Sequence, residues 1–275
     1  MLIVRFMQKS VAHPRFARVR REAPQVMEVL AANPILDGML PTGETLPYDP
    51  QAWQADPDAS LVELLPPVTP SKIVAIGSNY RNHAKEMGKP VPDEPILFMK
   101  PPSALLAPGR PIVRPPGYER VDYEGELAVV IGRRLHRTPP ESVAAGIFGY
   151  TALNDVTVRD LQKKDGQFTR AKGFDSFCPV GPAIATDIDP LRFRLRTRKN
   201  GVQQQDTAGD ELVFSVVQLV SFISHVMTLL PGDVISTGTP AGVSNMNPGD
   251  VVEIELDGVG ILRNPVVAGL PRPPL

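Results

Sequence analysis

The sequence predicts a mainly β protein of the α+β class, for three reasons. Its 31 prolines and 22 glycines are dispersed between short apolar runs, a spacing typical of many short strands joined by rigid turns. Residues 231–235 and 248–252 both read Pro-Gly-Asp followed by two apolar residues, so each predicts a turn that leads into a strand. Only residues 213–229 form a long periodic apolar segment, which predicts the main helix, ended by Pro231-Gly232.

The first 70 residues differ from the rest of the chain. Residues 2–6 predict a strand, and residues 24–32 are interpreted as a helix. Residues 42–60 are polar and rich in turn formers, and residues 66–70 have the prolines of a linker. We therefore expect a small N-terminal domain over residues 1–70 and a larger domain over residues 71–275.

The larger domain opens with strands that have both faces covered. Ile73–Gly77 and residues 127–131 are apolar at odd and even positions alike, as in strands buried on both sides. Ile96–Lys100 is a further predicted strand. Residues 79–87 have helical character, and Gly88 supplies a stop signal.

Composition excludes several classes of function. A net charge of −1 over 275 residues does not argue for binding to nucleic acid or to anionic membranes, and no run approaches the ~18 apolar residues of a membrane span. The single cysteine, Cys178, rules out an intrachain disulfide framework and fits a reducing compartment, so we expect a cytoplasmic protein. An Arg-rich, acid-poor start is also typical of transit peptides, but the strand pattern and His13-Pro14 argue against one.

Two glutamates at the start of a buried strand are the strongest chemical signal. Glu124 and Glu126 precede the apolar residues 127–131, and residues i and i+2 of a strand point the same way. Two carboxylates that lose water together repel each other, and a divalent cation would relieve both problems. The alternative is a pair of surface glutamates at a strand end, screened by solvent.

Asp155 follows a second short apolar strand, where strand gives way to a turn or helix. There it either joins the two glutamates in a metal site or caps a helix or turn, which is the commoner use of Asp. Three carboxylates without a nearby His or Cys form an all-oxygen site, which suits Mg²⁺, Mn²⁺ or Ca²⁺ better than zinc.

A histidine and a lysine are further candidates. His83 and Glu86 are three residues apart in the predicted helix and can hydrogen-bond on one face, so that the imidazole acts as a general base. Such pairs are also common on helix surfaces. Lys172 lies in an apolar setting, where it either stabilises an oxyanion, pairs with a carboxylate, or extends to solvent.

Taken in order, these segments resemble the fumarylacetoacetate hydrolase family over roughly residues 72–265. The matching stretches are Ile76-Gly77-Ser78-Asn79-Tyr80-Arg81-Asn82-His83, Asp122-Tyr123-Glu124-Gly125-Glu126-Leu127, Gly149-Tyr150-Thr151 with Asn154-Asp155 and Arg159-Asp160-Leu161-Gln162, Ala171-Lys172-Gly173-Phe174-Asp175-Ser176-Phe177, and Pro231-Gly232-Asp233-Val234-Ile235-Ser236-Thr237-Gly238-Thr239-Pro240. Each stretch is weak evidence by itself, but five in the same order are specific.

The resemblance implies a fold and a set of site residues. The fold is the family's mixed β-sandwich roll with a smaller N-terminal region, in a homodimer. By resemblance, the metal ligands are Glu124, Glu126 and Asp155, the catalytic residues are His83, Glu86 and Lys172, and the substrate contacts are Tyr80, Arg159, Gln162 and Thr239. The cofactor implied is Mg²⁺ or Mn²⁺, with Ca²⁺ as a substitute in crystals.

The same resemblance implies a hydrolase that cleaves a C–C bond of a small 2-oxo acid, such as an acylpyruvate or fumarylacetoacetate. Two alternatives use the same metal enolate: an isomerase or tautomerase of a hydroxymuconate-type diacid, and an oxaloacetate decarboxylase. A catalytically silent metal-binding scaffold is a third class. Ser78, Gly173 and the polar residues 163–166 depart from the common family pattern, and they bear on specificity.

Overall fold

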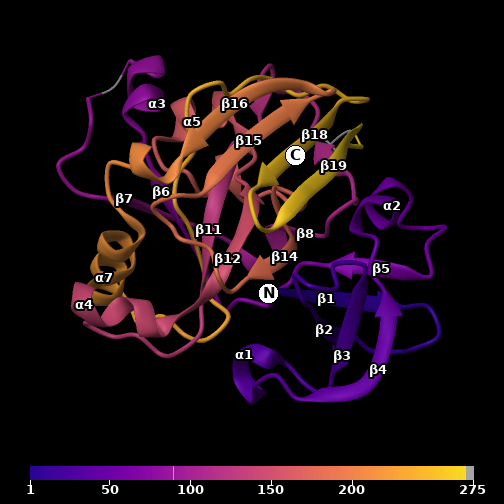
Figure 1. Cartoon of the computed structure of the whole chain (residues 1–275). Helices are drawn as coiled ribbons and strands as arrows, with labels where there is room; N and C mark the ends of the chain where they lie inside the picture. Colours follow the sequence, from indigo (N-terminus) through magenta and orange to yellow (C-terminus); the bar gives the residue numbers. More distant parts are fainter. Residues whose placement is uncertain (89, 271–275) are drawn as a thin grey trace.

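The computed structural model describes residues 1–88 and 90–270; residue 89 and residues 271–275 of the predicted larger domain lie outside the described residues. The described chain forms a twelve-stranded sheet, a five-stranded sheet and a separate two-stranded pair, with short helices around them (Figure 1). The prediction of a mainly β protein of the α+β class is confirmed.

The large sheet is mixed and runs through the whole molecule. Its main path is, in spatial order, β4 (Pro41–Pro47), β3 (Val26–Leu30), β2 (Arg15–Val19), β1 (Leu2–Gln8), β14 (Cys178–Ala185), β12 (Ile147–Asn154), β11 (Gly125–Ile131), β17 (Val234–Ser236), β6 (Ile73–Gly77) and β7 (Ile96–Lys100). Strand β5 (Val62–Leu65) pairs with β1, and β8 (Leu105–Leu106) with β14. Every residue of β11 is buried, as the apolar pattern predicted for this strand.

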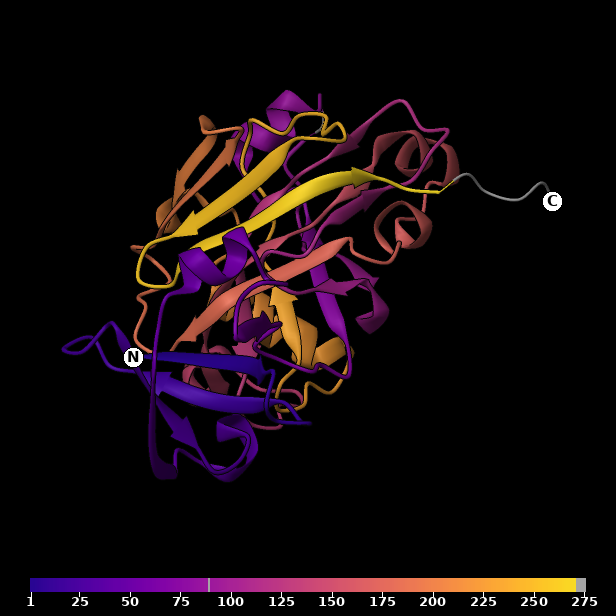
Figure 2. The ribbon, with the colours of Figure 1, turned by 90° about the vertical axis from the view of Figure 1, so that its right-hand side faces the viewer.

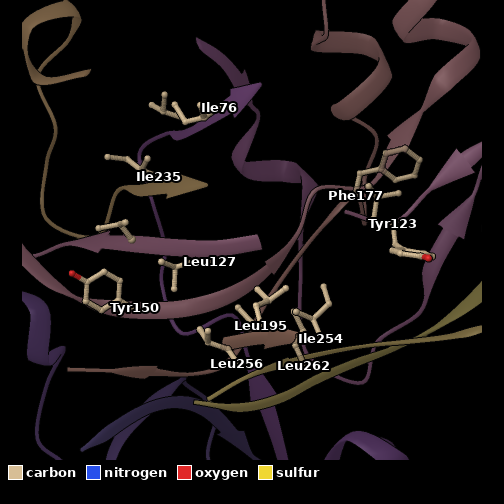
Figure 3. Packing of buried hydrophobic residues seen from close by; sticks show 14 of the residues in the cluster. Ile76, Tyr123, Leu127, Tyr150, Phe177, Leu195, Ile235, Ile254, Leu256 and Leu262 are labelled. Atoms are coloured by element: carbon tan, nitrogen blue, oxygen red, sulfur yellow. The ribbon is translucent and has the colours of Figure 1, made fainter. Parts of the chain in front are cut away.

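The five-stranded sheet covers the middle of the large sheet. Its spatial order is β16 (Val202–Ala208), β15 (Arg194–Lys199), β18 (Val251–Leu256), β19 (Gly260–Ala268) and β9 (Ile112–Arg114). Leu127 of β11 shares one buried cluster with Leu195 and Ile254 of the smaller sheet (Figure 3). This interface is the main hydrophobic core, and burial of each such side chain stabilises the fold by about 1.5–3 kcal/mol.

Gly125 permits a close approach of the two sheets. A Cβ at Gly125 would lie 2.1 Å from Oγ1 of the buried Thr197 in β15. Any larger residue would therefore separate the sheets between Glu124 and Glu126. The positions of the two glutamates thus depend on the packing of the core.

The helices are short. They are α1 (Pro34–Asp37), α2 (Pro50–Ala55), α3 (Arg81–Glu86), α4 (Pro140–Val143), α5 (Arg159–Asp165), α6 (Thr169–Lys172) and α7 (Val216–Val226), with 3-10 turns at Pro102–Ala104, Ala144–Gly146 and Gly209–Glu211. Helix α7 is shorter than the predicted 213–229, because the Ser215 side chain caps the N–H of Gln218 and so sets its start. Among the described residues, no helix is long and apolar enough to cross a membrane.

The predicted helix over residues 24–32 is wrong: this segment contains strand β3. Met27 and Val29 are buried, while Glu28 lies on the other face and accepts a hydrogen bond from Arg18 Nε of β2 at 2.6 Å. This two-residue alternation is the strand pattern, and pairing with β2 and β4 overrides the local helical character.

The N-terminal strands continue the large sheet, and Figure 2 shows them beside its central strands. Leu2 and Ile3 of β1 pair with Ala185 and Ile184 of β14. The polar residues 42–60 contain most of β4 and all of α2. The domain boundary at residue 70 stays a prediction.

Candidate active site

Strands β11 and β12 bring two of the predicted metal ligands together. The strands are antiparallel with Gly125 opposite Asn154, so Glu124 just before β11 lies beside Asp155 just after β12. The Asp155 N–H donates to the Glu124 carbonyl oxygen at 2.8 Å. The predicted closeness of these carboxylates therefore follows from the register of one strand pair.

The three carboxylates form one buried cluster. Glu124, Glu126 and Asp155 are 4%, 2% and 0% exposed, and one carboxylate oxygen from each lies within 4.8 Å of the others. The alternative of solvent-screened surface glutamates is therefore wrong, since desolvation keeps their charges from being screened.

Buried cations pair with two of the three carboxylates. Lys172 Nζ donates to Glu124 Oε2 at 2.7 Å and also to Asp155 Oδ2. Arg159 donates to Glu124 Oε1, and Lys100 Nζ donates to Asp155 Oδ1 at 2.6 Å. Burial favours a raised pKa for Glu124, but the charges of Arg159 and Lys172 outweigh it and hold this pKa well below its ordinary range.

Glu126 is different from its neighbours. Its Oε2 accepts hydrogen bonds from Ser236 Oγ and from the Gly238 N–H, the latter at 2.8 Å, and no cation among the described residues lies within ion-pair distance of it. Gly238 has φ +98°, a conformation that favours glycine and aims this N–H. Burial first, and then the charges of Asp155 and Glu124, raise the pKa of Glu126.

The cluster therefore fits a divalent cation. Glu126 Oε1 has no partner among the described residues, and the carboxylate oxygens that are hydrogen-bonded keep further lone pairs for a ligand bond. All-oxygen sites of this kind suit Mg²⁺, Mn²⁺ or Ca²⁺. The existing hydrogen bonds would orient the ligands from outside, as is usual at metal sites.

His83 and Glu86 form the predicted pair on helix α3. His83 Nδ1 lies 3.0 Å from Glu86 Oε2, and Glu86 Oε1 accepts from the Gly242 N–H at 3.0 Å. Glu86 thus connects the helix to the turn after β17. Because one imidazole nitrogen is held by Glu86, the other is available to a ligand, and His83 lines the central cavity.

The central cavity has a volume of about 40 Å³. Seven of the site residues predicted from the sequence line it: His83, Glu124, Glu126, Arg159, Gln162, Lys172 and Thr239. Gln162 Oε1 accepts from Arg159 Nη1 at 2.9 Å, and Thr239 Oγ1 donates to the Gly125 carbonyl oxygen at 2.9 Å. So small a volume holds little more than a water molecule, so a substrate must move some of these side chains on entry.

One predicted substrate contact lies elsewhere. Tyr80 is 1% exposed and is not among the lining residues of the central cavity. Tyr80 lies just before helix α3, and its backbone pairs with that of Leu212. Burial raises the pKa of the Tyr80 hydroxyl, which keeps it neutral.

Sequence reasoning missed Lys100 and gave no role to Asp122. Lys100 is fully buried, and its Nζ also donates to the Lys172 carbonyl oxygen at 2.6 Å. Asp122 is fully buried as well and accepts from Arg159 Nε at 2.7 Å. A charged residue at the end of an otherwise apolar strand was the only sequence signal for Lys100.

Comparison with known proteins agrees with the family resemblance of the sequence. Residues 72–267 match the family described as fumarylacetoacetate (FAA) hydrolase C-terminal. The mitochondrial oxaloacetate tautomerase of Xenopus laevis is 37% identical over 290 residues, which cover 97% of this chain and 90% of that protein.

Two proteins of known structure share the whole architecture. The 5-carboxymethyl-2-hydroxymuconate delta-isomerase of Mycobacterium smegmatis has 40% identity and a TM-score of 0.86, with 98% of this chain and 100% of that chain covered. The fumarylacetoacetate hydrolase of Exiguobacterium antarcticum has 32% identity and a TM-score of 0.83, with the same coverage. The mixed β-sandwich roll expected from the sequence is therefore confirmed, and the chain belongs to the fumarylacetoacetate hydrolase family.

Proposed function

We propose that this chain is a divalent-cation-dependent enzyme that moves a proton within a small 2-oxo diacid, as a tautomerase or isomerase. The observation that carries the proposal is the buried cluster of Glu124, Glu126 and Asp155 beside His83. The names of the Xenopus and Mycobacterium relatives favour proton transfer over hydrolysis.

The residues that line the cavity have separable roles in this proposal. A bound Mg²⁺ or Mn²⁺ would supply Lewis-acid stabilisation of negative charge on the 2-oxo group. Ca²⁺ could replace either ion in crystals. His83, oriented by Glu86, takes a proton from the carbon next to that group and returns it to another atom of the same substrate. Lys172 offsets the charge of the enolate.

The remaining polar residues position the substrate. Arg159 and Gln162 both line the cavity and are hydrogen-bonded to each other, and each keeps donors for a carboxylate. Thr239 lines the same cavity from the turn after β17. Tyr80 would act indirectly, by supporting the start of helix α3.

A second candidate is hydrolysis of a C–C bond in an acylpyruvate or fumarylacetoacetate-like acid. The similarity to the Exiguobacterium hydrolase favours it, and His83 is also suited to take a proton from water. Hydrolysis consumes water and yields two acids, whereas isomerisation conserves the substrate's atoms. Decarboxylation of oxaloacetate is distinguished by release of CO₂.

The test is an assay of the purified protein with Mg²⁺ or Mn²⁺ against oxaloacetate, 2-hydroxyhepta-2,4-diene-1,7-dioate, an acylpyruvate and fumarylacetoacetate. Metal-dependent keto–enol interconversion or double-bond migration supports the proposal. Two acid products would replace it with the hydrolase. Metal binding without turnover of any compound would favour a silent scaffold. His83→Ala, with intact metal binding, is the control for chemistry at this site.

The proposal also includes a homodimer in the cytoplasm that recognises no nucleic acid. Light scattering of the purified protein tests the dimer, and fractionation of cells tests the compartment.

A further inference from the structure

A wider cavity adjoins the central one. Its volume is about 460 Å³, within the ~300–1,000 Å³ range of ordinary ligand sites. Met87, Arg159, Gln162 and Phe168 line both cavities. A ligand whose head lies at the carboxylate cluster can therefore extend past these four side chains into the wider space.

The wider cavity is cationic. Besides the shared residues, Arg120, Lys163 and Gly166 line it, and none of its lining side chains is a carboxylate. Lys163, in the last turn of helix α5, has no ion pair with any residue that the structure describes. Arg120 uses Nε and Nη2 on Asp122, which leaves its Nη1 without a partner in the described chain.

Gln162 lies where the two cavities meet. Its Oε1 accepts from Arg159. Its amide N–H groups have no acceptor among the described residues. Donors are thus present from Arg159 and Gln162, which line both cavities, to Arg120 and Lys163, which line the wider one. Such a series suits an anionic group at the far end of a ligand.

We propose that Lys163 and Arg120 form a subsite for the distal carboxylate of a 2-oxo dicarboxylate, and that Lys163 is a specificity-determining residue. The inference rests on the proposed function, because it takes the 2-oxo acid head to lie at Glu124, Glu126 and Asp155. It adds that the preferred substrate has a spacer long enough to carry its second carboxylate beyond Gln162.

The chain offers a matched pair of variants. Lys163→Gln removes an exposed ammonium that lines the cavity, whereas Lys164→Gln removes the neighbouring exposed ammonium, which does not line it. The overall charge change is the same in both. Arg120 is left intact because its guanidinium also holds the buried Asp122.

The experiment measures binding of 2-oxoadipate and 2-oxohexanoate to the Mg²⁺-loaded protein by calorimetry. These ligands have the same chain length, and only the first has a distal carboxylate. We expect wild type to prefer 2-oxoadipate by about tenfold, the value of one hydrogen bond to a charged group. Lys163→Gln should remove most of this preference without changing the affinity for 2-oxohexanoate, and Lys164→Gln should keep it.

The outcomes separate this subsite from the proposed function. Binding of both ligands with equal affinity to wild type overturns the subsite and leaves the proposed function standing. Equal losses of preference in the two lysine variants overturn it too, because the effect would then be general electrostatics. Failure of both ligands to bind overturns the proposed function and the subsite together.

Discussion

Glu124 and Glu126 are two residues apart and equally buried, yet their replacement by glutamine should have opposite effects on the metal-free protein. Arg159 and Lys172 are paired with Glu124, whereas Glu126 has only neutral donors. Glu124→Gln leaves two buried cations with less opposite charge, and Glu126→Gln removes a carboxylate that repels its neighbours. The two variants therefore form a matched test of the electrostatics of the site.

The expected magnitudes follow from these partners. Breaking a buried ion pair from one side costs about 3–5 kcal/mol, so Glu124→Gln should lower the Tm of the metal-free protein by roughly 6–20 °C. Folding raises the pKa of Glu126, so ionised Glu126 destabilises the fold at pH values above the ordinary pKa of a carboxyl. Glu126→Gln should therefore leave the Tm at neutral pH unchanged or higher.

Metal binding should weaken in both variants, since each loses a charged ligand. Removal of an outer partner already costs about 10–100-fold in affinity, so loss of a ligand should cost about 100-fold or more, which is about 2.8 kcal/mol. The assay is calorimetric titration with Mg²⁺ or Mn²⁺, together with thermal unfolding in excess chelator. Equal destabilisation of the two metal-free variants, or an unchanged metal affinity in Glu126→Gln, would refute the reasoning.

Three further results are expected. His83→Ala should lower kcat by about 10²–10⁴-fold with unchanged metal affinity, and an unchanged kcat would exclude the general-base role. Because the raised pKa of Glu126 means that metal binding must displace a proton, metal affinity should increase from acid to neutral pH, and this dependence should flatten in Glu126→Gln. Gly125→Ala should lower the free energy of unfolding in urea by about 1–3 kcal/mol, because the new Cβ would lie 2.1 Å from Thr197 Oγ1. Unchanged stability would show that Thr197 moves freely.

The carboxylate cluster could be predicted because its signal is local. Glu124 and Glu126 share a strand face by simple alternation, and the apolar run that follows them shows that the strand is buried. Asp155 follows the neighbouring strand, so a single register determines its distance from Glu124. His83 and Lys172 were candidates from their own local sequence, and only the family resemblance connected them to the glutamates, because no spacing does so.

Other parts of the site depend on long-range packing. Lys100 ends a strand at the edge of the large sheet, far from Asp155 in sequence, and only the closed fold brings their charges together. Tyr80 belongs to a matching motif but immediately precedes helix α3 and does not line the central cavity. Strand β3 was missed because pairing on both its edges, rather than local propensity, determines its conformation.

The pairing of β1 with β14 has a consequence for the order in which the chain assembles during synthesis. On one edge Leu2 and Ile3 pair with Val19 and Arg18 of β2, but on the other edge their partners are Ala185 and Ile184 of β14. At ~5–20 residues per second, the ribosome needs roughly 10–40 s to reach that strand. Strand β5 pairs only with Arg5–Gln8 on this edge, so throughout this interval residues 2–3 remain an open template for other chains. Nascent copies are therefore vulnerable to mispairing there, and chaperones that shield strand edges should act on this protein early.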